Sequence, residues 1–203
     1  MLTLRNFLKE MVKRICIFCS SSDNIDKAHF DAAEKIALEL TKAGYVIVCG
    51  GGSHGLMGTI IETSAKNGGY AVGVIPEFMR AVEWDSKALN ELIVVDDMRE
   101  RKKRMIENAD AIVALAGGCG TLEELMEVIT LKRLGKFTKP IIILNTNGFY
   151  NHLKAFLVKM IDENFMNKQS VDIWKFIDTP EQILDAIDNS AAWNSDAIKF
   201  AVV

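Results

Sequence analysis

Two glycine-rich stretches each lie between an apolar run and a segment with helical periodicity. The first is CGGGSHGLMG at 49–58, and the second is AGGCGTLEEL at 116–125. Glycine permits positive φ angles and close approach of backbone amides to a ligand, and a helix N-terminus adds about half a positive charge. Two such turns at one site predict a cradle for an anion, most simply a phosphate ester. The residues concerned are Gly51, Gly52, Gly55, Gly117, Gly118, Gly120 and Thr121.

The spacing of these glycines argues against two common phosphate-binding motifs. Neither stretch ends in the Lys-Ser/Thr pair of a Walker motif, so a nucleoside triphosphatase is not expected. The run 50–52 followed by Gly55 does not match the dinucleotide fingerprint either. His54 is interpreted as a solvated loop residue, with ligand contact as the alternative.

A basic run, RERKKR at 99–104, directly follows another apolar run. Charge runs usually form a solvated helix face, which is the alternative interpretation here. The position of the run after a predicted strand favours placing Arg99 and Arg101 at the same edge as the glycine-rich turns. Because the planar guanidinium suits bidentate contact with phosphate or ribose oxygens, Arg101 is the predicted ligand-binding arginine, with Lys102 as a weaker helper.

Short apolar runs alternate with segments of helical periodicity along the chain. Strands that are nearly all apolar are buried on both faces, so the pattern predicts a doubly wound α/β fold with helices on both faces of a parallel sheet. Strands are predicted at 13–20, 45–49, 70–76, 92–97, 111–116, 140–145 and 173–178. Helices are predicted at 27–43, from 56, at 98–108, 121–134 and 150–165, and from 180, with an irregular stretch at 77–90.

These elements position the glycine-rich turns. In doubly wound sheets, ligands bind beyond the carboxyl ends of the strands, where the strand order reverses. Both turns fall at strand ends and open onto helices. The sequence therefore predicts that two helix N-termini face one phosphate site.

Length and composition limit the class of protein. The 203 residues with 49% apolar content predict one domain at 1–203, including an N-terminal extension at 1–12 and a C-terminal tail at 190–203. A net charge of −3 argues against a nucleic-acid partner, which needs a clustered basic face. Charges interrupt the apolar N-terminal stretch, and no apolar run is long enough for a membrane span, so a cytoplasmic protein without membrane association is expected.

The four cysteines, Cys16, Cys19, Cys49 and Cys119, are expected to be reduced thiols. Cys16 and Cys19 are three residues apart on a predicted strand, so their side chains should point to opposite faces, which disfavours shared metal ligation. A zinc or redox cluster of all four at one sheet edge is the alternative. No metal and no cofactor are predicted.

Four longer motifs resemble those of the LONELY GUY (LOG) family of nucleoside 5′-monophosphate phosphoribohydrolases. They are GGGSHGLMG at 50–58, DMRERKKRM at 97–105, GGCGTLEEL at 117–125 and LGKFTKPIIILNTNGFYNHL at 134–153. The resemblance covers about residues 15–187 and implies a Rossmann-like homodimer that hydrolyses the N-glycosidic bond of a purine nucleoside monophosphate, a cytokinin riboside 5′-monophosphate among them. Family members also carry the label "possible lysine decarboxylase", which the residues do not support, because a PLP enzyme needs an identifiable Schiff-base lysine.

Family motifs fall on particular residues of this chain. The PGGxGTxxE motif matches Ala116, Gly117, Gly118, Gly120, Thr121 and Glu124, with alanine in place of the usual proline. The basic signature matches 98–102, with Arg99 in place of the usual histidine. The resemblance thus implies that Arg101 is the catalytic arginine and that Met98 and Lys102 bind substrate.

Two further departures from the family pattern bear on base preference more than on the reaction. The residues at 19–22 read Cys-Ser-Ser-Ser where the family has Cys-Gly-Ser-Ser, and their hydroxyls are candidates to reach a phosphate. Ser21 is the candidate substrate-binding residue among them. Leu131 stands where the family usually has tryptophan.

Glu124 is the candidate catalytic carboxylate. Cleavage of a glycosidic bond passes through an oxocarbenium-like transition state, so the site needs a carboxylate near the developing positive charge and a means of activating water. A structural alternative exists, because Thr121-x-x-Glu124 also fits a capping box that closes the helix N-terminus. One geometry cannot serve both roles at once.

Three functional hypotheses remain: the phosphoribohydrolase, a nucleotide-binding sensor or carrier, and an enzyme of another reaction type acting on a phosphosugar or nucleotide. The presence of both Arg101 and Glu124 favours the hydrolase. The family resemblance and an apolar helix at 122–135 also predict a homodimer. The apolar residues of that helix are Leu122, Leu125, Met126, Ile129 and Leu134.

Overall fold

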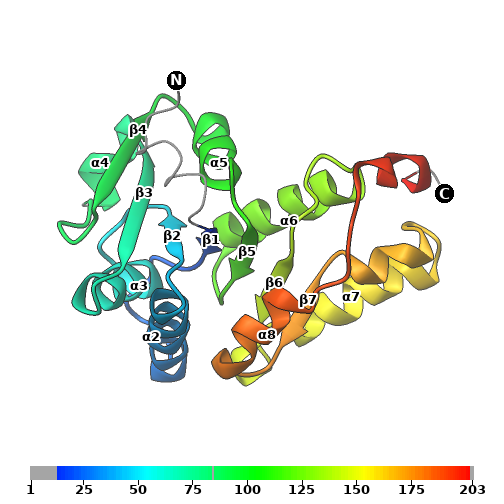
Figure 1. The fold of residues 1–203 in the computed structure, drawn as a ribbon, viewed down its shortest axis with the longest axis horizontal. Coiled ribbons are helices and arrows are strands. Elements are labelled where there is room, and N and C mark those ends of the chain that lie inside the picture. Colours follow the sequence, from blue (N-terminus) through cyan, green and yellow to red (C-terminus); the bar gives the residue numbers. More distant parts are fainter. Residues whose placement is uncertain (1–12, 84, 202–203) are drawn as a thin grey trace.

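A computed structural model describes residues 13–83 and 85–201, so the predicted N-terminal extension at 1–12 lies outside the described residues. The described chain forms a sheet flanked by helices (Figure 1). Its strands are β1 (Arg14–Phe18), β2 (Val46–Cys49), β3 (Tyr70–Pro76), β4 (Glu91–Val95), β5 (Ala111–Ala114), β6 (Ile141–Leu144) and β7 (Lys175–Ile177).

The strands pair in the order β4-β3-β2-β1-β5-β6-β7, and every pair of neighbours is parallel. The chain first builds the sheet outward from β1 to β4, then returns to β5 on the other side of β1. The strand order therefore reverses between β1 and β5, which is where ligands bind in doubly wound sheets. The predicted fold class is confirmed.

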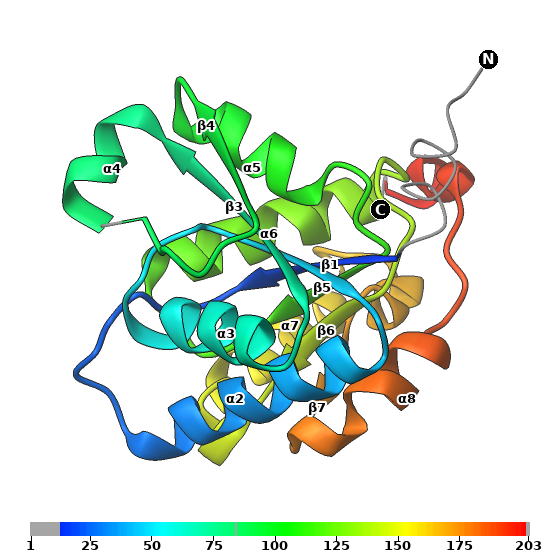
Figure 2. The same ribbon diagram turned by 60° about the vertical axis from the view of Figure 1, so that its left-hand side comes forward.

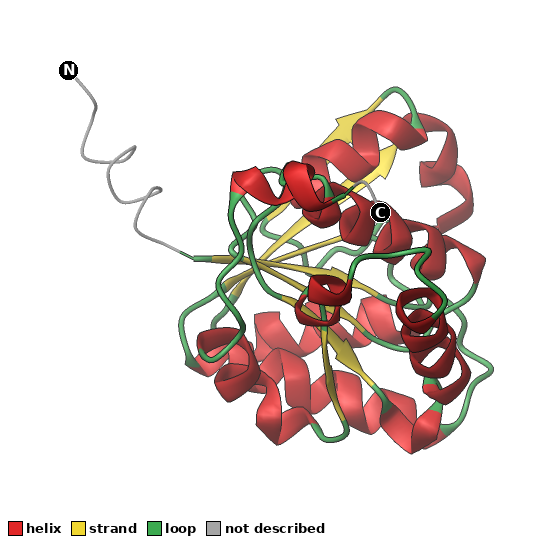
Figure 3. Ribbon diagram, turned by 90° about the vertical axis from the view of Figure 1, so that its right-hand side faces the viewer, coloured by secondary structure: helices red, strands yellow, loops and turns green. Residues whose placement is uncertain are grey.

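Helices cover both faces of the sheet, as Figure 3 shows with the strands lying between helical layers. The α-helices are α2 (Lys27–Lys42), α3 (Gly55–Lys66), α4 (Glu77–Glu83), α5 (Met98–Ile106), α6 (Cys119–Arg133), α7 (Asn151–Asp162) and α8 (Ile183–Asp188). The short 3-10 helices are η1 (Thr146–Gly148), η2 (Lys168–Asp172), η3 (Pro180–Gln182) and η4 (Ser195–Phe200).

Two hydrophobic clusters form the core, one on each face of the sheet. Ile15 and Ile17 of β1 pack with α2, α3 and α8, whereas Cys16 and Phe18 pack on the side of α5, α6 and α7 (Figure 2). This alternation follows from the two-residue period of a strand. Because both faces are buried, the strands are apolar at nearly every position, which explains the continuous apolar runs in the sequence.

Three details differ from the sequence-based expectation. The stretch predicted to be irregular contains α4, and α6 begins at Cys119 rather than at Thr121. The predicted C-terminal tail packs against the body of the protein. The indole Nε1 of Trp193 donates to the carbonyl oxygen of Lys132 at 2.7 Å, and η4 follows it. The tail thus fixes the C-terminal end of α6.

The cysteines behave as separate thiols in the structure. Cys16 and Cys19 lie in opposite core clusters, as their spacing predicts, and Cys49 is also buried, whereas Cys119 is exposed. Burial raises the pKa of the Cys16 and Cys19 thiols well above the usual value and that of Cys49 to about 11. These three thiols therefore stay protonated and poorly nucleophilic at neutral pH.

Within the described part of the chain, no helix combines the length and the apolar character that crossing a membrane requires.

Candidate active site

A cavity of about 370 Å³ opens at the carboxyl ends of the central strands. Segments that follow β1, β2 and β5 meet there, at the reversal of strand order, and α4 and α5 close the side over β3. The lining residues are Ile17, Cys19, Ser20, Ser21, Ser22, Gly50, Met57, Met79, Met98, Arg101, Met105, Gly118, Gly120, Thr121 and Glu124. Two segments that are about 75 residues apart in sequence, around 50 and 124, therefore face one space.

Arg101 enters this cavity from α5 and is only 5% exposed. Its Nε donates to the Val74 carbonyl at 3.1 Å, and its Nη2 donates to the Gly50 carbonyl at 3.5 Å. The helix that carries it is fixed by Asp97, whose carboxylate accepts from the amides of Arg99 and Glu100, both at 2.8 Å. These contacts hold the guanidinium in one orientation.

Glu124 reaches the same cavity from α6. After burial, the negative charge of Glu124 is the largest cause that raises the pKa of Cys16, a residue of β1. The two predicted catalytic residues thus line one cavity although they come from different helices. A cation and a carboxylate meet here in surroundings formed largely by methionine, cysteine and glycine.

The start of α6 faces the cavity through its first turn. The helix begins at Cys119, and its N-cap residue, Gly118, has no side chain to accept from the first amides. Because the first amides of any helix have no intrahelical acceptor, this turn presents donors to a ligand. A Cβ on Gly118 or Gly120 would meet nothing within 4 Å, so open space lies beside both.

This helix boundary shows that the capping-box hypothesis for Glu124 is wrong. A capping residue must precede the first helical turn, but Thr121 is the third residue of α6 and is 5% exposed. Glu124 is consequently the sixth helical residue and lies too far along α6 to close its N-terminus. Gly117 lies outside the lining residues, and a side chain there would overlap the Thr121 hydroxyl. Its role is close packing within the turn.

The first glycine-rich turn is built differently from the prediction. The Gly55 amide at the start of α3 donates to Asp23 Oδ1 at 2.7 Å, and the next amide, of Leu56, donates to the Ser20 carbonyl at 3.0 Å. The N-terminus of α3 therefore has acceptors inside the protein. The expectation that two helix N-termini face one site is corrected: of the two predicted cradles, the start of α6 is the open one.

Glycines of the first turn are also needed for its backbone conformation. Gly51 and Gly55 have φ angles of +86° and +59°, which favour glycine, and neither lines the cavity. Gly52 donates its amide to Met57 Sδ and also lies outside the lining. His54 Nδ1 lies 2.8 Å from Asp23 Oδ2, half exposed, so it supports the capping carboxylate.

Lys102 lies away from the cavity, contrary to its predicted helper role. Its Nζ pairs with Glu123 and with Glu127, the latter at 2.7 Å, and it lines a separate hollow between α5 and α6. Successive residues of a helix are rotated by about 100°, and Lys102 points from α5 toward Glu123 and Glu127 of α6, whereas Arg101 points into the cavity.

Several lining residues were absent from the sequence-based site. Gly50 is the first residue after β2, and its position at a strand end was the available signal. The methionines were predicted to be core or dimer contacts, because helical spacing alone does not separate a core side chain from a cavity wall. The missed methionines are Met57, Met79 and Met105.

We expect Gly50→Ala to reduce catalytic efficiency on the order of tenfold, because displacement of a positioned group is costly. A Cβ at this position would overlap Arg101 Nη2 and lie 2.9 Å from Met57 Cε, so the guanidinium must move. Steady-state kinetics measure the effect. If Gly50 acts through Arg101, the double variant with Arg101→Lys should be no worse than Arg101→Lys alone, and fully additive losses would contradict this role.

Fold and cavity together define a Rossmann-like α/β protein with a ligand site at the reversal of strand order. The sequence model of the family described as "possible lysine decarboxylase" matches residues 57–187. The chain belongs to this family, which is the LOG family.

Plant proteins of this family are similar to most of the chain. Cytokinin riboside 5′-monophosphate phosphoribohydrolase LOG2 of Arabidopsis thaliana is 37% identical over 190 residues, covering 94% of this chain and 89% of that protein. Cytokinin riboside 5′-monophosphate phosphoribohydrolase LOG5 of the same plant is 40% identical over 173 residues, covering 85% of this chain and 75% of that protein.

Solved structures with lower identity share the fold. The molybdenum cofactor binding protein of Rippkaea orientalis has a TM-score of 0.67 at 21% identity, with 88% of this chain and 97% of that chain covered. The Moco carrier protein of Chlamydomonas reinhardtii has a TM-score of 0.68 at 18% identity, with 87% and 96% covered.

The cavity does not fit the decarboxylase label of the family model. A PLP-dependent decarboxylase forms a Schiff base with a lysine. The residues lining the cavity in the described part of the chain include no lysine. The polar groups of the cavity are instead a guanidinium, a carboxylate, hydroxyls and helix amides.

Proposed function

We propose that the protein hydrolyses the N-glycosidic bond of a purine nucleoside 5′-monophosphate, with adenine or an N6-modified adenine as the base. Water adds to the ribose C1′, and the products are the free base and ribose 5-phosphate. One observation carries the proposal: Arg101, Glu124 and the uncapped start of α6 line a single cavity. The names of the 37–40% identical relatives support the same reaction.

In this proposal, the 5′-phosphate lies at the start of α6. The amides of the first helical turn donate to its oxygens, and the helix dipole favours its negative charge. Ser20, Ser21 and Ser22 add hydroxyl donors from the end of β1. Anchoring the phosphate orients the glycosidic bond toward Glu124 and Arg101 and supplies binding energy for the chemical step.

Glu124 and Arg101 act on the ribose. The carboxylate of Glu124 stabilises the positive charge that develops on the ribose ring and orients the attacking water. The guanidinium of Arg101 donates to ribose or phosphate oxygens in a fixed fork. The base leaves toward the side lined by methionines, whose flexible thioethers fit rings of different size.

The sensor or carrier hypothesis is the second candidate. The solved carrier proteins share the fold at 18–21% identity, which concerns architecture alone. A carrier requires binding without a positioned carboxylate and arginine. The presence of Arg101 and Glu124 in the cavity therefore favours the hydrolase.

The proposed phosphate anchor predicts that AMP and N6-substituted AMP release free base at least tenfold faster than the corresponding nucleosides. Liquid chromatography of the reaction products measures the release. Equal turnover of nucleoside and nucleotide would contradict the anchor at α6. If no purine monophosphate is hydrolysed although AMP binds, the carrier is the correct function.

We further propose a homodimer in the cytoplasm. Leu125 and Ile129 of α6 are buried in the core, but Leu122 is exposed and Met126 is half-buried in the hollow shared with α5. This leaves an apolar strip available to a second copy. We expect static light scattering at micromolar concentration to give twice the 22.6 kDa chain mass, and a monomeric mass would contradict the dimer.

A further inference from the structure

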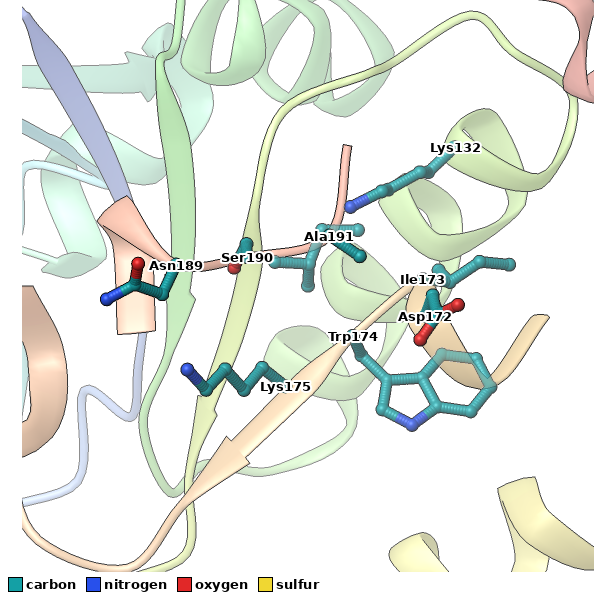
Figure 4. A pocket seen from close by; sticks show the side chains of 9 residues that line it. Lys132, Asp172, Ile173, Trp174, Lys175, Asn189, Ser190 and Ala191 are labelled. Atoms are coloured by element: carbon teal, nitrogen blue, oxygen red, sulfur yellow. The ribbon is translucent and has the colours of Figure 1, made fainter. Parts of the chain in front are cut away.

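A second cavity lies at the C-terminal end of α6, away from the residues assigned to hydrolysis. Its volume is about 220 Å³, and it is enclosed by the end of α6, the segment from η2 into β7, and the chain just after α8 (Figure 4). Lys132 contributes from α6, Asp172 and Lys175 from the second wall, and Ser190 from the third.

Lys132 is the unusual residue of this cavity, because its side chain is only 1% exposed. Figure 4 shows its amine end pointing across the hollow toward Ser190 and Ala191. Among residues 13–83 and 85–201, its Nζ forms no hydrogen bond or ion pair; the Trp193 ring lies 5.8 Å away, and the negative charge of Asp172 also acts favourably on the ammonium. Burial lowers the pKa of Lys132 to about 8, and the negative charge of Asp172 offsets only part of this cost.

The other charges of the cavity differ from Lys132. Lys175 Nζ pairs with Asp185 Oδ2 at 3.6 Å, so it is already compensated. Asp172 is exposed and adds a negative charge to the same wall of the hollow, which disfavours a ligand with more than one negative charge. Ile141, Ile173 and Ala191 supply apolar wall. The cavity therefore combines one buried cation with a wall that is polar in its larger part and apolar at Ile141, Ile173 and Ala191.

We propose that this cavity binds a short-chain aliphatic monocarboxylate, whose carboxylate pairs with the Lys132 ammonium and whose alkyl part contacts Ile141 and Ile173. Such a ligand has one charge for one buried cation, and a two- to four-carbon chain is small enough for 220 Å³. Carboxylate–ammonium hydrogen bonds are strong in an apolar environment. The site is separate from the catalytic cavity and does not depend on the proposed hydrolysis.

Thermal unfolding of the full chain with sodium propionate tests the proposal, with sodium chloride at equal ionic strength and propionamide as controls. We expect propionate to raise the melting temperature saturably, by about 5 °C or more at a hundredfold excess over its dissociation constant. Propionamide, which has the same shape without the charge, should have no effect. A wild-type protein whose melting temperature propionate leaves unchanged would overturn the proposal.

Three variants test whether Lys132 is responsible for the change in melting temperature caused by propionate. Lys132→Met, which keeps the length of the side chain, should abolish the propionate shift, whereas Lys175→Met should retain it because Lys175 is paired with Asp185. At a pH well below the pKa of Lys132, where the ammonium stays charged without Asp172, Asp172→Asn should tighten binding at least twofold, and this provides a test in the opposite direction that does not rely on the Lys132 variant folding. A shift that persists in Lys132→Met, or one that is lost in both lysine variants, would overturn the assignment, as would unchanged binding by Asp172→Asn.

Discussion

Glu124→Gln is expected to lower turnover of a purine nucleoside monophosphate at least a hundredfold while leaving the fold intact. The amide keeps the size of the side chain but removes the negative charge proposed to stabilise the developing oxocarbenium ion. Loss of one positioned charge or base has an effect of this size. Product chromatography under saturating substrate measures the rate.

Binding and folding can be separated from catalysis in the same preparation. The uncapped start of α6 is unchanged in Glu124→Gln, so AMP should still raise the melting temperature of the variant. Glu123→Gln is the matched control, because Glu123 is the preceding residue and pairs with Lys102 outside the cavity. A stable, nucleotide-binding and fully active Glu124→Gln protein would end the catalytic assignment.

Arg101→Lys is expected to reduce kcat/KM by about a hundredfold, although the positive charge is retained. Lysine has no planar fork, so it cannot contact the Val74 and Gly50 carbonyls and also present donors to the ribose. The loss should appear mainly in kcat if the fork acts on the transition state rather than on bound substrate.

The same substitution two positions earlier is the control for Arg101→Lys. Arg99 lies on the exposed side of α5 and does not line the cavity, so Arg99→Lys should stay within about twofold of wild type. Equal losses in the two variants would show that the effect is not specific to the geometry of Arg101.

Periodicity predicted the sheet well because each strand is buried on both faces. Ile15 to Phe18 are all apolar since alternate side chains enter two different core clusters, and such runs are visible in a single sequence. The edge of the sheet at which the cavity lies was predicted from the alternation of strands and helices along the chain. Boundaries were less predictable: α4 lies in a stretch without clear periodicity, and the start of α6 depends on the backbone of Gly118.

The sequence predicted which types of residue form the site, but it did not predict the contacts between distant segments that build it. Arg101 and Glu124 line one cavity as expected, but their catalytic roles stay predictions. The amides at the start of α3 donate to Asp23 and to the Ser20 carbonyl, which lie more than 30 positions earlier in the chain. No local sequence pattern indicates such contacts. Lys102 was misplaced because a basic run gives composition but not the rotation of each side chain about its helix.

The cavity has walls of two different kinds. Arg101 and Glu124 lie on α5 and α6, and both helices pack into the core, through Met105 and Leu125 respectively. Met79 instead lies on α4, a seven-residue helix in the connection from β3 to β4. Connections tolerate changes of length and composition far better than core elements do. The wall at Met79 and the proposed catalytic residues Arg101 and Glu124 consequently belong to separable parts of the chain, so a lineage can exchange that wall without rebuilding the helices that carry the proposed chemistry.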